Sequence, residues 1–263
     1  MGRELGSVDR DDVYGNTFRA IAQDAPALLI PIVNRMFGTC YTDKAVIRFS
    51  SDQTFFEDCT SCHSLEADLH LVVAEDGAEE DFLFEVQRTP DSETFIRIPQ
   101  YILGADMEVV VEETADGEVL AYAKPPRAGL ICLRAPDELE SPVCLYLQLS
   151  AGTAVSEMPI LQIDQITLDD ILQEPLIALT PFYLFRYASG LAGIEQDEAR
   201  RDKLLSEYCR IASTLKARAA SGEISRQESE LLTALTEKAV DALAPEQPLI
   251  REGVKEILRK AER

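Results

Sequence analysis

Three polar residues in one short segment have the chemistry to hold a metal ion together. Asp68 begins an alternating apolar run, Glu85 and Gln87 end a second one, and Asp76-Gly77 lies between the runs. Asp-Gly is a favourable turn dipeptide, so the segment predicts a β-hairpin. In a hairpin centred on or just after this turn, Asp68 faces the level of Glu85 and Gln87. Two carboxylates and an amide beside a buried sheet indicate a site for a hard divalent cation.

The same acids also fit an ordinary solvated strand face, which is commonly polar in antiparallel sheets. Strand side chains alternate between faces, so Glu85 and Gln87 share one face of the sheet. The acidic segment AEDGAEED between the runs is interpreted as solvated turn residues. His70 shares the face of Asp68 by the same alternation, and the ordinary expectation for it is a packed or solvated histidine.

At these residues the chain resembles the PD-(D/E)XK nuclease superfamily, and more narrowly its bacterial recombination-promoting nuclease and transposase group. That group has an (R/S/A)-D-(L/V) strand, a turn, a strand ending in (I/F)-E-(I/V)-Q, an S/T-x-P-D-like segment and Arg-x-x-x-Tyr on a helix. The matching residues are Ala67-Asp68-Leu69, Phe84-Glu85-Val86-Gln87, Thr89-Pro90-Asp91, and Arg97 with Tyr101. Pro126 to Arg134 and Met158 to Phe182 resemble later elements, so the resemblance spans residues 12 to 187.

This resemblance implies a DNA endonuclease that depends on Mg²⁺ or Mn²⁺ and is connected with recombination or mobile elements. Asp68, Glu85 and the main-chain carbonyl of Val86 are the implied metal ligands. A metal so held lowers the pKa of a bound water and stabilises charge on the scissile phosphate. Arg97 and Tyr101, four residues apart on a predicted helix, are the implied substrate-binding residues.

One position departs from the pattern of the superfamily, and another departs from the pattern of the narrower group. Gln87 stands where the superfamily has a lysine, and an amide can orient the attacking water without adding positive charge. In the segment YGNTFRAIA, Gly15 stands where the group often has an acid, so a helix-borne acidic ligand is missing there. The alternatives, among which spacing does not choose, are Asp11, Asp12 and Glu66.

The charge of the chain argues partly against DNA as a ligand. There are 47 acidic and 25 basic residues, for a formal net charge of −22. Residues 200–263 carry a net charge of +2, so residues 1–199 carry −24. DNA affinity usually comes from a basic patch, and an acidic surface slows association with a polyanion. The alternative function is therefore a weakly active or inactive nuclease-fold protein that binds protein partners through its acidic surface.

Six cysteines fit a reducing compartment, and one pair among them has unusual spacing. Cys59-Thr60-Ser61-Cys62-His63 matches the C-x-x-C-H motif of c-type haem attachment, but haem needs export and zinc needs two more ligands. We interpret it as a chance pair in a loop. No initial apolar segment predicts a signal peptide, and the longest early run, ALLIPIV, is too short to cross a membrane. The expected compartment is the cytoplasm.

The order of elements predicts an α/β fold with a restriction-endonuclease-like mixed sheet flanked by helices over residues 12–190. Residues 18–36 predict one or two helices interrupted near Pro31, and a helix is expected from Ser92 to Leu103. Thr167 to Asp170 predicts a helix-capping box. Further strands are expected in the runs MEVVVEE, EVLAYA, AGLICLR and CLYLQLS.

A helical C-terminal extension is expected over residues 195–263. Three amphipathic stretches are separated by Ser221-Gly222 and by a break at Pro245 to Pro248, and Ser225 with Glu228 predicts another capping box. We expect these helices to pack against the core of their own chain. The alternative is a homodimer formed through their apolar faces.

Overall fold

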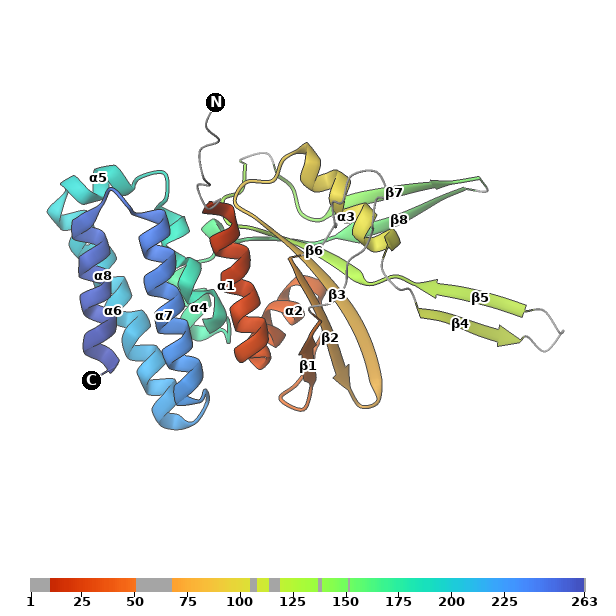
Figure 1. The fold of residues 1–263 in the computed structure, drawn as a ribbon, viewed down its shortest axis with the longest axis horizontal. Helices are drawn as coiled ribbons and strands as arrows, with labels where there is room; N and C mark the ends of the chain where they lie inside the picture. The colour runs from red at the N-terminus through yellow and green to blue at the C-terminus, as the bar shows by residue number, and fades with distance from the viewer. Residues whose placement is uncertain are drawn as a thin grey trace, which may run out of the picture.

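A mixed β-sheet with helices on both faces forms the centre of the protein (Figure 1). The computed structural model describes residues 10–50, 68–104, 108–113, 119–136, 139–150 and 152–262. In spatial order the strands are β1 (Val46–Phe49), β2 (Leu69–Glu75), β3 (Ala78–Gln87), β6 (Arg127–Cys132) and β9 (Ile160–Gln162). β1, β2 and β3 run antiparallel, whereas β3, β6 and β9 run parallel. The predicted α/β class with a mixed sheet is confirmed.

The hairpin of β2 and β3 forms around the predicted turn. Asp76 and Gly77 both have positive φ angles, 52° and 84°, as a two-residue type I′ turn requires. The pairing continues without a slip to Leu69 opposite Phe84. This register fixes the face of every side chain on both strands, because a slip of one residue would exchange the faces.

Helices cover the two faces of the sheet. α1 (Arg10–Asp24) and α2 (Ile30–Phe37) belong with Phe84 to one buried cluster, and α3 (Ser92–Gly104) packs over the neighbouring Leu83 on the other face. The break predicted near Pro31 lies earlier, at Ala25, where the short 3-10 helix η1 (Pro26–Leu29) begins. Pro31 instead occupies the first turn of α2, where its missing N–H leaves no bond unmade.

Two hairpins extend beyond the sheet as arms (Figure 1). One pairs β4 (Glu108–Glu113) with β5 (Val119–Lys124), and the other pairs β7 (Val143–Leu149) with β8 (Gly152–Met158). They expose large apolar side chains, including Val111 at 63% and Tyr146 at 66%. The strands predicted in MEVVVEE, EVLAYA and CLYLQLS are confirmed as β4, β5 and β7, whereas β8 was not predicted from the sequence.

The C-terminal helices pack against the core, as expected. The connecting elements η2, α4, η3 and α5 lead into the three long helices, and α7 contacts both α1 and η3. One buried cluster runs continuously from Phe18 on α1 to Leu258 on α8. The bounds are η2 (Ile163–Gln165), α4 (Leu168–Gln173), η3 (Ile177–Tyr187), α5 (Leu191–Gln196), α6 (Glu198–Ser221), α7 (Arg226–Leu243) and α8 (Pro248–Glu262).

Local sequence signals account for the ends of these helices. Capping boxes at Thr167 and Ser225 begin α4 and α7, as predicted. Gly222, with φ 78°, ends α6 in the left-handed conformation that glycine adopts without strain. None of the described helices is both long and apolar enough to cross a membrane.

A buried carboxylate fastens α8 to α5. Glu195 accepts hydrogen bonds from the main-chain N–H groups of Leu249 (2.8 Å) and Ile250 (3.1 Å), in the first turn of α8. Glu195→Ala should lower the free energy of unfolding by about 1–3 kcal/mol, because two main-chain donors, one of them buried, lose their acceptor. Urea unfolding measures this loss. Glu246→Ala, at an exposed acid just before α8, is the control, and equal losses in both variants would contradict the role given to Glu195.

Candidate functional site

Asp68 lies directly before β2, beside the end of β3. Its carboxylate Oδ2 accepts the main-chain N–H of Val86 at 2.8 Å, so the side chain continues the hydrogen bonding of the hairpin. Arg19 on α1 reaches the same residue, with Nε donating to the carbonyl oxygen of Asp68 at 2.9 Å and Nη2 3.6 Å from Oδ1. Continuing the observed register places Asp68 opposite Glu85.

Glu85 and Gln87 share one face of β3 and contact each other. Glu85 Oε1 accepts from Gln87 Nε2 at 2.8 Å, and Arg97 Nη2 lies 2.9 Å from the same oxygen. Only 4% of the Glu85 side chain is exposed. A carboxylate this deeply buried needs a compensating charge and hydrogen bonds, and Arg97 and Gln87 contribute both.

The segment Thr89-Pro90-Asp91 positions Arg97. Asp91 Oδ1 accepts the main-chain N–H of Thr94 at 2.9 Å and its hydroxyl at 3.0 Å, at the start of α3. These bonds lower the pKa of Asp91, the bond from the Thr94 main chain most of all. The helix that carries Arg97 therefore begins at a defined place after β3.

Gly15 on α1 lies over Asp68. A Cβ built at Gly15 would be 3.2 Å from Asp68 Oδ1, which is a tight contact. The helix position where the resembled group often has an acid is therefore next to Asp68, but glycine adds no oxygen ligand there. The side chains of Asp11, Asp12 and Tyr101, and the whole of Glu66, lie outside the described residues.

The donor chemistry fits a hard cation, although the set of side chains is small. Two carboxylates and a main-chain carbonyl at one strand end are the oxygen ligands that Mg²⁺ prefers. Within the described parts of the chain, no three His, Cys, Asp or Glu side chains form a group able to hold a metal. Asp68 and Glu85 each contact an arginine instead. A cation entering here has to compete with guanidinium groups.

The sequence analysis missed Arg19, although a signal for it existed. Arg19 follows Gly15 by four residues, so both lie on one face of α1. His70, for which a packed or solvated histidine is expected, is buried and its Nε2 lies 2.8 Å from Asp81 Oδ1. It is a packed histidine. The C-x-x-C-H motif, Cys59 to His63, lies outside the described residues.

Cys132 is the last residue of β6 and pairs with Gln87 on β3. Burial raises the pKa of its thiol to about 12, so the thiol stays protonated and unreactive near neutral pH. Iodoacetamide at pH 8, followed by mass spectrometry, should label the exposed Cys40, Cys144 and Cys209 and leave Cys132 unmodified. Unfolding in urea should make Cys132 reactive. Labelling of Cys132 in the native protein at the rate of Cys144 would contradict this assignment.

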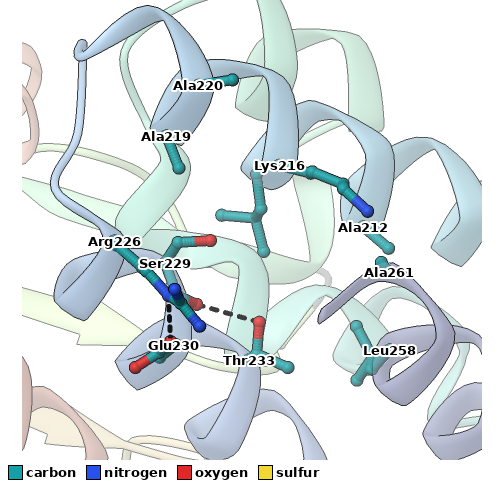
Figure 2. Close-up of a pocket in the computed structure, with 11 residues that line it drawn as sticks. Ala212, Lys216, Ala219, Ala220, Arg226, Ser229, Glu230, Thr233, Leu258 and Ala261 are labelled. Carbon is teal, nitrogen blue, oxygen red and sulfur yellow. Dashed lines mark hydrogen bonds and ion pairs between the residues drawn. The ribbon is translucent and has the colours of Figure 1, made fainter. Parts of the chain in front are cut away.

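A separate hollow of 270 Å³ lies among α6, α7 and α8 (Figure 2). Ala212, Leu215 and Leu258 form part of its apolar wall. Arg226 at its rim is paired with Glu230, with Nε 2.7 Å from Oε1. None of the predicted site residues lines this hollow. The homodimer suggested for these helices stays a prediction.

Fold and site together define a mixed α/β protein with a carboxylate pair at the end of its central hairpin. Comparisons with protein-family models, curated proteins and solved structures found no match to the chain.

Proposed function

We propose that the protein is a PD-(D/E)XK-type nuclease that hydrolyses DNA phosphodiester bonds with Mg²⁺ or Mn²⁺, in recombination or at mobile elements. The observation that carries this proposal is the register of β2 and β3, which brings Asp68 to the level of Glu85. The succession of α1, three antiparallel strands, α3 and the parallel strand β6 also supports a restriction-endonuclease-like core.

Each site residue has a defined chemical role in this proposal. Asp68, Glu85 and the carbonyl of Val86 hold the ion, which when bound lowers the pKa of a water and stabilises charge on the phosphate. Gln87 orients the attacking water by hydrogen bonding, because an amide both donates and accepts. Arg97 donates to a phosphate oxygen, for which its planar guanidinium is suited.

Plasmid nicking tests the proposal. We expect the wild-type protein to nick supercoiled DNA with Mg²⁺ and not with EDTA, and the double change Asp68→Ala, Glu85→Ala to abolish nicking. Glu93→Ala with Glu157→Ala is the matched control, because it removes the same charge from two exposed positions. Circular dichroism verifies folding. Equal nicking by the wild type and the Asp68, Glu85 variant would eliminate the site.

A second candidate function is a nuclease-fold protein without catalysis that binds a basic protein partner. The specific observation in its favour is that arginines neutralise both carboxylates while Gly15 replaces the expected acid. The net charge of −22 agrees with such a partner. This function predicts no metal-dependent nicking. It also predicts a stable complex in pull-down that weakens at high salt.

A further inference from the structure

The Arg97 guanidinium contacts the candidate site, but not all of its hydrogen-bond donors have an acceptor among the described residues. Its Nη2 lies 2.9 Å from Glu85 Oε1, and its side chain is 36% exposed. Its Nε is buried and has no hydrogen-bond partner among the described residues. A buried donor without an acceptor costs free energy. An arrangement that supplies an acceptor to Nε would remove this cost.

Arg19 makes a different kind of contact with its own carboxylate. Its Nε donates to the main-chain carbonyl of Asp68 at 2.9 Å, while Nη2 is 3.6 Å from the carboxylate. Arg19 therefore keeps an anchor when the carboxylate takes another partner. Arg97 instead contacts the Glu85 carboxylate itself, the group that a cation needs.

A divalent cation and the Arg97 guanidinium would compete for the same Glu85 carboxylate. Like charges a few ångströms apart repel strongly in a partly buried site. Entry of the cation therefore weakens the hold of Glu85 on the guanidinium. The exposed fraction of Arg97 gives the displaced group access to solvent and to a ligand on the surface.

We propose that Arg97 couples cation binding to phosphate binding: it neutralises Glu85 until a divalent cation takes its place, and then donates to a phosphate oxygen. This inference rests on the proposed function, because it assumes that Glu85 holds the cation. A phosphate presents the acceptor that Nε lacks, and arginine binds such oxygens through two donors. The acidic chain thus gains a positive donor at the site when the cation arrives.

Mn²⁺ affinity, followed by electron paramagnetic resonance of the free ion, tests the competition. Arg97→Gln keeps an amide donor for Glu85 but removes the charge, and it should tighten Mn²⁺ binding by about tenfold, or ~1.4 kcal/mol. Arg134→Gln is the matched control at an exposed arginine just after β6 and should bind like the wild type. Glu85→Gln should weaken binding, which locates the ion.

A DNA-binding measurement tests the phosphate contact. Fluorescence anisotropy of a labelled duplex, with Ca²⁺ as a cation and with EDTA, should show that the cation strengthens binding by the wild type. The strengthening should be about tenfold smaller for Arg97→Gln. If this variant unfolds, Arg97→Lys replaces it, and its weaker single-point contact should give an intermediate Mn²⁺ affinity.

The outcomes separate this inference from the proposed function. If the wild type and Arg97→Gln bind Mn²⁺ equally and Glu85→Gln weakens binding, the competition is overturned while the metal site remains. If none of these proteins binds Mn²⁺, the proposed function fails and this inference fails with it. A tenfold gain in Arg97→Gln, lost again when Glu85→Gln is added, supports both.

Discussion

Replacing Gln87 with lysine is expected to raise the rate of metal-dependent plasmid nicking by about 10–100-fold, since a single well-placed donor is worth about 10²–10³ in such reactions. Gln87 is half-buried and donates to Glu85 at 2.8 Å. A lysine there can keep this donation and adds a positive charge beside the reacting phosphate. Initial nicking rates at saturating Mg²⁺ measure the effect.

Gln87→Met is the control for this change. Methionine approximates the length of glutamine without its donor, so its rate should fall below that of the wild type. A folded Gln87→Lys protein that nicks no faster than the wild type would show that charge at this position does not limit the reaction. It would also weaken the link between Gln87 and the lysine of the resembled superfamily.

Truncation of Arg97 to alanine should destabilise the protein at least as much as Glu195→Ala does. Arg97→Ala should lower the free energy of unfolding by about 3 kcal/mol, because it removes the ion pair between Arg97 and the buried Glu85 carboxylate. This value is at the lower end for buried pairs, because Arg97 is 36% exposed and water screens part of the interaction. Urea unfolding at pH 7 measures it.

A double-mutant cycle assigns this loss to the ion pair. When Glu85→Gln is already present, Arg97→Ala should cost much less, because no buried charge remains to be compensated. A cost of about 0.5 kcal/mol for the single change, as for ordinary surface substitutions, would mean that the pair contributes little.

The parts of the fold that follow from local signals could be predicted from the sequence. Asp76-Gly77 specifies a tight turn, and the turn determines the register that aligns Asp68 with Glu85. Ser225 and Gly222 mark helix ends in the same way. These signals act over a few residues, so no knowledge of tertiary packing is needed to interpret them.

The parts that depend on packing could not be predicted in this way. β1 has four residues and β9 three, too few to show a pattern, and the exposed β8 has no apolar face. The pairing of Arg19 with Asp68 joins α1 to a strand 49 residues later. Such contacts arise from how helices lie on the sheet, which side-chain spacing along the chain does not encode.

The two projecting hairpins have a consequence for how the protein behaves in solution. In the part of the chain that the structure describes, each hairpin is a two-stranded sheet, so its strands have open edges next to exposed valine and tyrosine, a combination that promotes edge-to-edge aggregation. Mutual repulsion of molecules carrying a charge of −22 opposes such association near neutral pH. That repulsion disappears as the pH approaches the isoelectric point of 4.4, so we expect mild acid to promote association through the two hairpins.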